Sequence, residues 1–299
     1  MLILLLVKHE CLSILEMQYI PTSHVSKGRL PDLSLVIDTN VIQNKQVIQG
    51  HYRMALDAPA IAEQAKPGQF LHVSCGSTHD PLLRRPISIH ALDRNTGMVS
   101  ILYRVAGKGT ALLAERKAGD IINIIGPLGN GFTMPKCDRK VFVVSGGIGI
   151  VPLYFLLQEL AGFGIKATVF QGASTSELIL LEDEIKKLGH TVIIATDDGT
   201  KGFHGSVTEL FENYLREGRV GQGTSRAYAC GAFGMQRNLS EITARWGIPC
   251  EVALEERMGC GVGACLSCAC KVKNEDGGST YRRVCREGPV FPSGKVIWE

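Results

Sequence analysis

Between residues 35 and 125 the sequence consists of short apolar runs separated by turn-forming residues. The turns are rich in glycine, proline and asparagine, as in Lys66–Gln69, Asp93–Gly97 and Gly126–Gly129. Regularly spaced runs of this kind predict the strands of an antiparallel barrel or sandwich. The clearest expected strands are Phe70–Val73, Ile87–Ile89, Val99–Tyr103 and Ile121–Ile125.

After Pro135 the pattern changes to longer apolar runs that alternate with helical stretches. Lys140–Ser145 has the continuous apolar character of a buried strand, and Val151–Leu160 follows it as a predicted helix. Ser176–Leu188 shows helical periodicity, with acidic residues early and lysines late. Alternating strands and helices predict a parallel sheet with helices on both faces. The remaining expected elements are strands at Ala167–Phe170, Thr191–Ala195 and Arg226–Cys230 and a helix at Val207–Leu215.

These patterns divide the chain into four expected segments. They are an N-terminal extension (1–33), a β-barrel domain (34–135), an α/β domain (136–250) and a small Cys- and Gly-rich subdomain (251–299). The apolar run Met1–Val7 is too short to cross a bilayer, which takes about 20 residues. It also lacks the basic residues and cleavage site of a secretory signal. We assign no function to the extension, and Met17 is an alternative start.

Composition narrows the class of protein. Apolar residues make up 45% and charged residues 20% of the 299 residues, as in ordinary soluble globular proteins. The net charge is +3, and no basic stripe accompanies it, so we expect neither nucleic acid nor a membrane as a partner. Ten cysteines are unusual in a chain that can bury a core without disulfides. Half of them lie between Cys260 and Cys285, which favours a metal centre in a reducing cytoplasm.

The spacing of these cysteines points to one kind of centre. Cys260, Cys265 and Cys268 form a C-x4-C-x2-C run, and Cys285 follows at a distance, as in plant-type [2Fe–2S] proteins. Glycines between them allow a tight loop whose N–H groups point at sulfur. A structural zinc site is the alternative, although zinc ligands usually come as two close couples. Cys270 is either a small buried residue or a redundant ligand.

A glycine-rich turn, Ser145–Pro152, lies between the predicted strand at 140–145 and the helix that follows. Backbone N–H groups at such a helix start bind phosphate, and glycine lets a dinucleotide approach closely. Packing alone is the other explanation, since the turn lacks the G-x-G-x-x-G form and an acidic residue at the usual spacing.

Two segments of the first domain carry weaker indications of a phosphate or flavin site. In Leu83–Ser88, an arginine can bind a phosphate bidentately, and the serine on the same strand can reach the polar edge of a flavin. A solvated basic strand edge is the simpler explanation of that segment. Gly107–Thr110 is a loop with free N–H groups and a hydroxyl.

Taken in chain order, the arginine segment, the glycine-rich turn and the cysteine run resemble the ferredoxin–NAD(P)+ reductase superfamily. In that superfamily a flavin-binding barrel with an R-x-Y-[ST] motif precedes a dinucleotide domain. Gly146–Gly149, Thr196–Gly199 and Cys230–Met235 look like its nicotinamide-domain motifs. Leu254–Cys265, together with Arg84–Ser88, resembles the family of electron-transfer subunits of bacterial NAD-dependent (type 1B) dihydroorotate dehydrogenases. The resemblance extends from near Leu35 to the C-terminus.

The resemblance implies the cofactors FAD, [2Fe–2S] and NAD, and a set of residues for each. The FAD contacts would be Arg85, Pro86, Ile87 and Ser88, completed by Leu102, Tyr103, Arg104, Gly109 and Thr110. The NAD pyrophosphate would lie at Gly146, Gly147 and Gly149, with Cys230 near the nicotinamide. The cluster ligands would be Cys260, Cys265, Cys268 and Cys285.

Two positions and one segment depart from the family pattern without removing a ligand. Ile87 replaces the flavin-stacking Tyr of most of the superfamily, Ala232 replaces a Pro, and Asn274–Gly278 forms a polar turn before Cys285.

The implied activity is electron transfer from dihydroorotate, oxidised in an FMN-containing catalytic subunit, to NAD+ in pyrimidine biosynthesis. The implied assembly is a heterotetramer of two and two, docked through the cluster end. One alternative is an NAD(P)H-dependent reductase subunit that feeds a hydrogenase, a sulfite reductase or a ferredoxin pool. Another is a binding module whose cluster senses redox state or iron. Gly172–Thr175 holds no cation for a 2′-phosphate, which favours NAD over NADP.

Overall fold

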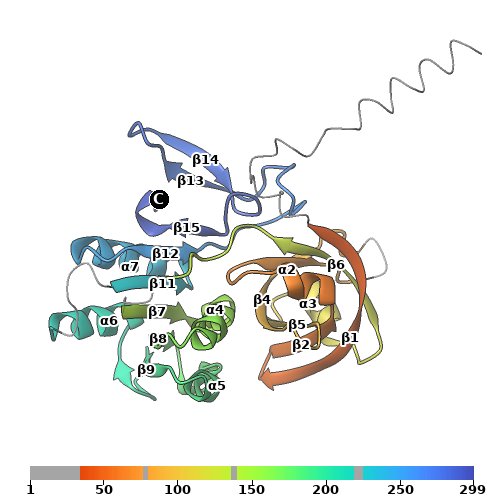
Figure 1. Cartoon of the computed structure of the whole chain (residues 1–299), viewed down its shortest axis with the longest axis horizontal. Helices are drawn as coiled ribbons and strands as arrows, with labels where there is room; N and C mark the ends of the chain where they lie inside the picture. Colours follow the sequence, from red (N-terminus) through yellow and green to blue (C-terminus); the bar gives the residue numbers. More distant parts are fainter. Residues whose placement is uncertain (1–33, 77–79, 136–139, 219–224) are drawn as a thin grey trace, which may run out of the picture. The chain divides into compact units, whose positions relative to one another are not determined.

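The computed structural model describes residues 34–76, 80–135, 140–218 and 225–299 (Figure 1). The extension expected at residues 1–33 lies outside these ranges, as do Cys11 and Cys137. In the described part of the chain, no helix has both the length and the apolar character needed to cross a membrane.

The first part of the described chain is a closed antiparallel barrel with the strand order β1-β2-β5-β4-β3-β6. All four predicted strands are present, and the barrel rather than the sandwich is observed. The first two strands were not predicted, because exposed polar residues interrupt their apolar pattern. The elements are β1 (Leu35–Ile48), β2 (His51–Asp57), α2 (Pro59–Gln64), β3 (Phe70–Val73), β4 (Arg85–Asp93), β5 (Met98–Arg104), α3 (Lys108–Ala114) and β6 (Ile121–Leu128).

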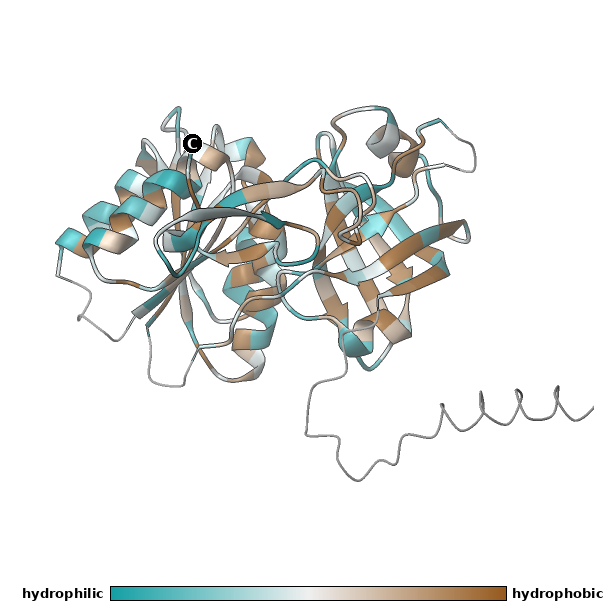
Figure 2. Cartoon of the chain, turned by 90° about the horizontal axis from the view of Figure 1, so that it is seen from above, coloured by the Kyte–Doolittle hydropathy of each residue, from teal (hydrophilic) through white to brown (hydrophobic). Residues whose placement is uncertain are grey.

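Alternate residues of the strands fill the barrel, as the period of two requires. Figure 2 shows the hydrophobic residues along the barrel strands in brown. Strand β3 departs from this alternation, because all four of its residues are buried. Leu71 and Val73 belong to the barrel core, whereas Phe70 belongs to the core of the following domain. The outer face of β3 is therefore covered by the rest of the chain.

The second part is a sheet with the strand order β10-β9-β8-β7-β11-β12-β15. All of its neighbouring strands are parallel except β12 and β15, so the predicted parallel sheet is confirmed with one antiparallel edge strand. Its strands are β7 (Lys140–Gly146), β8 (Ala167–Ala173), β9 (Thr191–Thr196), β10 (Phe203–His204), β11 (Ser225–Cys230), β12 (Cys250–Ala253) and β15 (Val290–Pro292).

Helices cover both faces of this sheet, as expected (Figure 1). Along β7, Val141 and Val143 pack on the face of α4 and α5, and Phe142 and Val144 pack on the face of α6 and α7. The predicted helix at 207–215 is confirmed, and Ser206 begins it with a capping box that includes Glu209. The helices are α4 (Ile150–Gly162), α5 (Glu182–Lys187), α6 (Val207–Arg216) and α7 (Phe233–Arg245), and short 3-10 turns are η2 (Gly147–Gly149) and η3 (Ser176–Leu178).

The single helix predicted over 176–188 is wrong. A break separates η3 from α5, and within it Leu181 adopts a left-handed conformation with φ of 62°. The buried amide of Gln171 holds this break by donating to the carbonyl oxygen of Leu180 at 2.7 Å. Periodicity could not reveal the break, because Leu180 and Leu181, which lie within it, are buried as they would be on the apolar face of a helix.

The C-terminal part contains a two-stranded hairpin, β13 (Ala269–Lys273) with β14 (Ser279–Arg283), followed by β15 and η4 (Ser293–Lys295). The polar segment Asn274–Gly278 is the turn of this hairpin, closed by the N–H of Asn274 donating to Gly278 at 2.9 Å. Strand β15 returns to pair with β12, so the Cys-rich segment is anchored in the large sheet at both of its ends.

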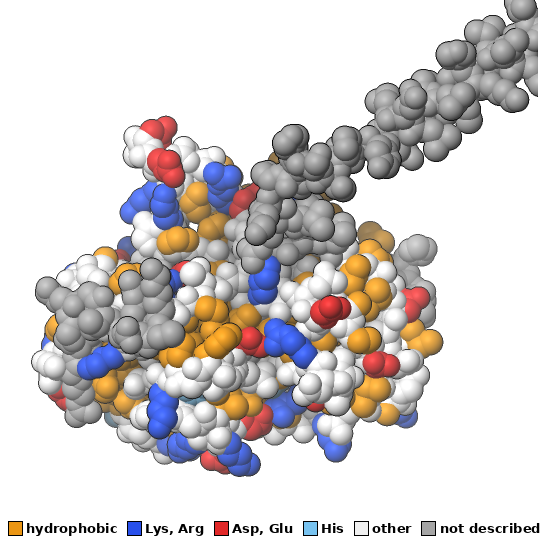
Figure 3. Space-filling model, in the orientation of Figure 1, with side chains coloured by type: hydrophobic (Ala, Val, Ile, Leu, Met, Phe, Trp, Pro, Cys, Tyr) orange, Lys and Arg blue, Asp and Glu red, His pale blue; other side chains and the backbone are white. Residues whose placement is uncertain are grey.

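The barrel and the sheet domain contact each other mainly through β4 and α4. His90 stacks on Tyr154 with ring centroids 4.7 Å apart, and Arg53 pairs with Glu184 at 2.7 Å. Figure 3 shows Lys and Arg interspersed with Asp and Glu over the visible face.

Candidate functional site

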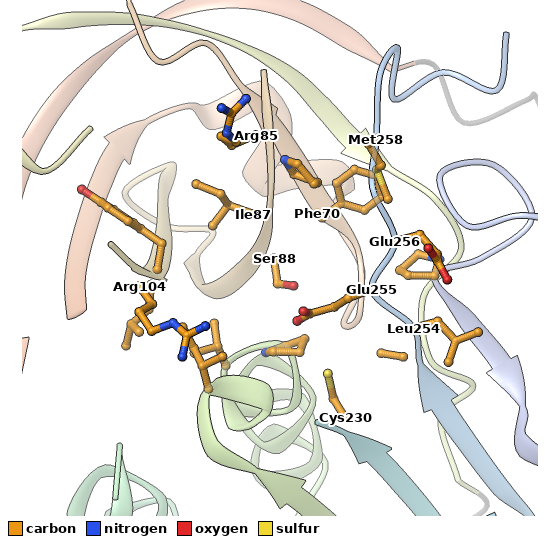
Figure 4. A pocket seen from close by; sticks show the side chains of 18 of the residues that line it. Phe70, Arg85, Ile87, Ser88, Arg104, Cys230, Leu254, Glu255, Glu256 and Met258 are labelled. Carbon is orange, nitrogen blue, oxygen red and sulfur yellow. The ribbon is translucent and has the colours of Figure 1, made fainter. Parts of the chain in front are cut away.

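A cavity of about 300 Å³ lies between the barrel and the sheet domain (Figure 4). It gathers most of the residues that the resemblance assigned to FAD, since they lie on adjacent strands of one barrel wall. The predicted residues that line it are Arg85, Pro86, Ile87, Ser88, Leu102, Tyr103, Arg104, Thr110 and Cys230. Ile148, Val151 and Pro152 complete the wall on the sheet-domain side.

Only one of the two adjacent arginines faces this cavity. Arg85 lines it, while Arg84 turns away and donates to the carbonyl oxygen of Asn123 at 3.0 Å. Gly109 does not line the cavity but supports Arg85, because a Cβ at Gly109 would stand 2.9 Å from the guanidinium Nε. The close packing of glycine and guanidinium forms a cradle that fits an anionic phosphate.

The apolar part of the cavity is built from buried side chains. Ile87 and Leu102 are buried, and Tyr103 donates from its hydroxyl to Asn44 Oδ1 at 3.2 Å. Burial raises the pKa of Tyr103 well above its ordinary value, so the phenol stays protonated. A flat apolar ring system such as a flavin fits this wall, which needs no rearrangement of its side chains.

Ser88, Glu255 and Cys230 gather at one end of the cavity (Figure 4). Burial raises the pKa of the Cys230 thiol well above its ordinary value, and the nearby charge of Glu255 raises it further. Burial also raises the pKa of Glu255, whereas Arg104 opposes that shift. Ser88 and Cys230 were predicted site residues, whereas Glu255 was not. Glu255 stands two residues beyond the carboxyl end of β12, where ligands bind in open sheets, and this position is the indication that could have identified it.

The three predicted NAD-binding glycines do not line this cavity, and the structure gives them different surroundings. Gly147 has φ of 53° and open space around its Cα, which leaves room for a ligand. Gly149 is required for packing, because a Cβ at this position would stand 2.5 Å from the carbonyl carbon of Cys230, whereas a Cβ on Gly146 would meet only the flexible side chain of Met235 closely, at 2.9 Å from Sδ. The turn lies at the carboxyl end of the parallel strands, where dinucleotides bind.

Three of the four predicted cluster cysteines lie on the loop before β13, Cys285 lies in the turn after β14, and the four form two couples. Cys265 contacts Cys260, and the N–H of Cys285 points at Cys268 Sγ at 3.4 Å. Within the described residues, no three His, Cys, Asp or Glu side chains surround a single point that could hold one metal ion. Two thiol couples fit a two-iron cluster, in which each iron takes two thiolates.

The backbone of the loop is also suited to sulfur ligands. The N–H groups of Val262, Ala264 and Cys265 point at Cys260 Sγ at 3.2 to 3.4 Å. Burial opposes ionisation of this thiol, but these N–H groups lower its pKa to about 6. The chain's own donors therefore stabilise a thiolate before any metal contributes.

Cys270 lies on β13, apart from both couples. It is buried in the core, and burial raises its pKa to about 11, as expected for a structural thiol. Phe70 lines the cavity and belongs to the same extended apolar core as Cys268 and Cys285. Phe70 was not among the predicted site residues, because only the fold shows that the outer face of β3 is covered.

Two segments match known domains. Residues 255–297 match the iron–sulfur cluster binding domain of dihydroorotate dehydrogenase B. Residues 143–241 match the oxidoreductase NAD-binding domain. These ranges contain the thiol couples and the glycine turn.

Solved structures share the architecture. An NADH-dependent reduced ferredoxin-NADP oxidoreductase, studied for flavin-based electron bifurcation, superposes with a TM-score of 0.75 at 25% identity, covering 87% of this chain and 90% of that one. A ferredoxin NADP+ reductase from Neisseria gonorrhoeae, solved with FAD and NADP, has a TM-score of 0.60 at 17% identity, covering 71% and 92% of the two chains. The second likeness shows the fold alone.

Two relatives that are similar in sequence are matched over nearly their whole length. The chain is 48% identical over 267 residues to the dihydroorotate dehydrogenase B (NAD(+)) electron transfer subunit of Desulforamulus reducens, covering 89% of this chain and 100% of that protein. It is 40% identical over 259 residues to the subunit of the same name from Geobacillus kaustophilus, covering 86% and 96%. This chain belongs to the family of dihydroorotate dehydrogenase B (NAD(+)) electron transfer subunits.

Proposed function

We propose that this chain takes up electrons released by dihydroorotate oxidation in a separate catalytic subunit and delivers them to NAD+, in the cytoplasm, as a step of pyrimidine biosynthesis. We further propose that the catalytic subunit carries FMN and that the complex is a heterotetramer with two copies of each subunit. The observation that carries the proposal is the position of Met258, which lines the cavity and stands two residues before Cys260. The chain thus leads directly from the flavin site to the cluster loop within one compact unit.

Each proposed cofactor has a set of residues that fits it. FAD would occupy the cavity on β4 and β5, with Arg85 at its phosphates, and the [2Fe–2S] cluster would be held by Cys260, Cys265, Cys268 and Cys285. When bound, the cluster supplies one-electron exchange and the flavin supplies hydride exchange with a nicotinamide.

The side chains of the protein bind and orient the cofactors and exclude water from them. Ile87 and Leu102 form an apolar wall that keeps water from the ring system. Burial raises the pKa of Glu255, and its carboxyl lies on the cavity wall together with Cys230. We propose that NAD+ binds along the turn at Gly147, with its nicotinamide directed toward Cys230. Gly172–Thr175, at and beyond the end of β8, offers no cation for a 2′-phosphate.

The test is reconstitution with a catalytic subunit. The full chain is co-expressed with the FMN-dependent dihydroorotate dehydrogenase of the same genome and purified without oxygen. Iron, flavin and the visible spectrum are measured, followed by dihydroorotate-dependent reduction of NAD+ and of NADP+. We expect about two irons and one FAD per chain, turnover with NAD+, and a clear preference for NAD+ over NADP+. A matched complex with Cys268→Ala should lose NAD+ reduction. It should still oxidise dihydroorotate at the catalytic subunit when a dye serves as the electron acceptor.

Two outcomes would contradict the proposal. Zinc in place of iron would point to the structural metal site, and absence of tightly bound flavin would point to a binding module. A third outcome is a protein that holds both iron and flavin and reduces dyes with NADH, but does not reduce NAD+ at the expense of dihydroorotate. That result would instead support a reductase that feeds a hydrogenase, a sulfite reductase or a ferredoxin pool.

A further inference from the structure

His72 of β3 is a buried polar residue that the sites described above leave without a role. Its side chain is fully buried, and among the described residues neither Nδ1 nor Nε2 forms a hydrogen bond of ordinary geometry, although the ring approaches the backbone of Cys260 and of Arg84. An unpaired buried polar group costs about 1–3 kcal/mol. Leu71 and Val73, its neighbours on β3, point into the barrel core, so His72 points outward, and its burial comes from the chain that covers this face.

The cluster loop is part of that cover. A Cβ built on Gly261 would stand 2.5 Å from His72 Nδ1 and 3.0 Å from its Cγ. Gly261 also has φ of 73°, so both its conformation and its contact with the ring require glycine. The imidazole therefore packs directly on the residue that follows Cys260, with Nδ1 as the ring atom nearest to the loop.

The backbone of His72 is fixed by the flavin-binding strand. His72 lies opposite Pro86 in the β3–β4 ladder, and Arg84 donates to its carbonyl oxygen at 3.4 Å. The same residue thus has its main chain paired with the flavin strand and its side chain against the cluster loop. No other contact described above joins the Cys260 end of the loop to β4 through one residue.

We propose that His72 is a positioning residue that sets the cluster loop against the flavin strand. We also propose that its Nδ1–H is a hydrogen-bond donor to the cluster sulfur atoms held at the Cys260 end of the loop. This inference rests on the proposed function, because it requires iron at the four cysteines. Donors to cluster sulfurs stabilise the reduced state, which carries one more negative charge, and so raise the reduction potential.

The experiment compares three variants in the full chain with its catalytic subunit, all purified without oxygen. His72→Leu removes both nitrogens at similar bulk. His72→Asn places an amide N–H near the position of Nδ1, and His72→Gln places one near Nε2. The readouts are iron content, the EPR spectrum of the reduced cluster and its midpoint potential by redox titration. The matched control is His90→Leu, since His90 is an equally buried barrel histidine whose ring stacks on Tyr154.

We expect His72→Leu to make cluster reduction about tenfold less favourable, equivalent to about 59 mV for a one-electron couple, with an altered EPR spectrum. His72→Asn should restore most of the potential, His72→Gln should not, and His90→Leu should leave it unchanged. If His72→Leu purifies without iron, retention of the cluster by His72→Asn supports the proposal, and equal loss in both variants overturns it.

A wild-type potential in His72→Leu, or an equal shift in His90→Leu, also overturns the role of His72. Absence of iron from the wild-type protein would instead refute the proposed function, so the two failures are distinguishable.

Discussion

Gly149, at the end of the turn after β7, lies directly against Cys230, the last residue of β11. A Cβ on Gly149 would overlap the carbonyl oxygen of Cys230 and stand 2.5 Å from its carbonyl carbon and 2.7 Å from the N–H nitrogen of Gly231. All three contacts are with backbone, which cannot move aside as a flexible side chain can. The start of α4 therefore reaches the end of β11 only because residue 149 is glycine.

Gly149→Ala should separate the start of α4 from β11, which moves Val151 and Cys230 apart on the wall of the cavity. We expect a loss of about 1–3 kcal/mol in the free energy of unfolding and weaker NAD+ binding. Urea titration and NADH-dependent dye reduction provide the measurements. Gly162→Ala, in the last turn of the same helix with open space around it, should instead be neutral or stabilise by about 0.4–1 kcal/mol. Equal effects of the two substitutions would contradict this account.

Gly109→Ala should weaken FAD binding almost as much as Arg85→Ala. The new methyl group would stand 2.9 to 3.1 Å from the guanidinium and displace it from the cavity wall. Loss of one charge-assisted hydrogen bond is worth about 1.5–3 kcal/mol, roughly a tenfold to hundredfold increase in Kd. Flavin fluorescence during dilution measures the Kd. Gly107→Ala is the control, since Gly107 has an extended backbone and nothing near its Cα, and it should retain FAD.

Cys268→Ala and Cys270→Ala should behave differently although the residues are neighbours in sequence. Cys268 forms a couple with Cys285, whereas Cys270 is a buried thiol of β13. Cys268→Ala should lose the iron and the visible absorption of the cluster, and Cys270→Ala should keep both. Iron analysis and the visible spectrum under anaerobic conditions decide the matter. Loss of iron in Cys270→Ala would identify Cys270 as a ligand.

His90 should make the protein less stable as the pH falls below about 6.5. Burial chiefly, with the charge of Arg53, lowers the pKa of His90 to about 3 in the folded protein, while a backbone contact with Val151 opposes the shift. The unfolded chain therefore binds one more proton than the folded chain between these values, and the free energy of unfolding decreases with falling pH. Between pH 7.5 and pH 5.5 the loss from this one group is about 1.4 kcal/mol.

The variant His90→Phe keeps the ring that stacks on Tyr154 but cannot titrate. It should lose about 1.4 kcal/mol less than the wild type between the two pH values, as measured by urea titration at each. His204→Gln, at an exposed histidine, should keep the wild-type pH dependence. An unchanged pH dependence in His90→Phe would show that His90 does not contribute.

The sequence by itself determined the elements and the chemistry that depend on neighbouring residues. Apolar runs located β3, β5 and β7, and the C-x4-C-x2-C spacing located three of the four thiols, because short-range periodicity and loop length are local properties. The family resemblance added the flavin residues, most of which line one cavity. Local patterns failed at residues 176–188, where the contact between Gln171 and Leu180 breaks the helix.

Only the tertiary structure decided which of these groups meet. Glu255 joins Ser88 and Cys230, Gly109 supports Arg85, and His72 packs on Gly261, in each case across a large separation in sequence. Such contacts depend on how a closed barrel and a twisted sheet pack together, which no periodicity within one segment encodes. The physical reason is that the sequence of a strand fixes only the face of the sheet on which each side chain lies. The residues that cover that face come from elsewhere in the fold.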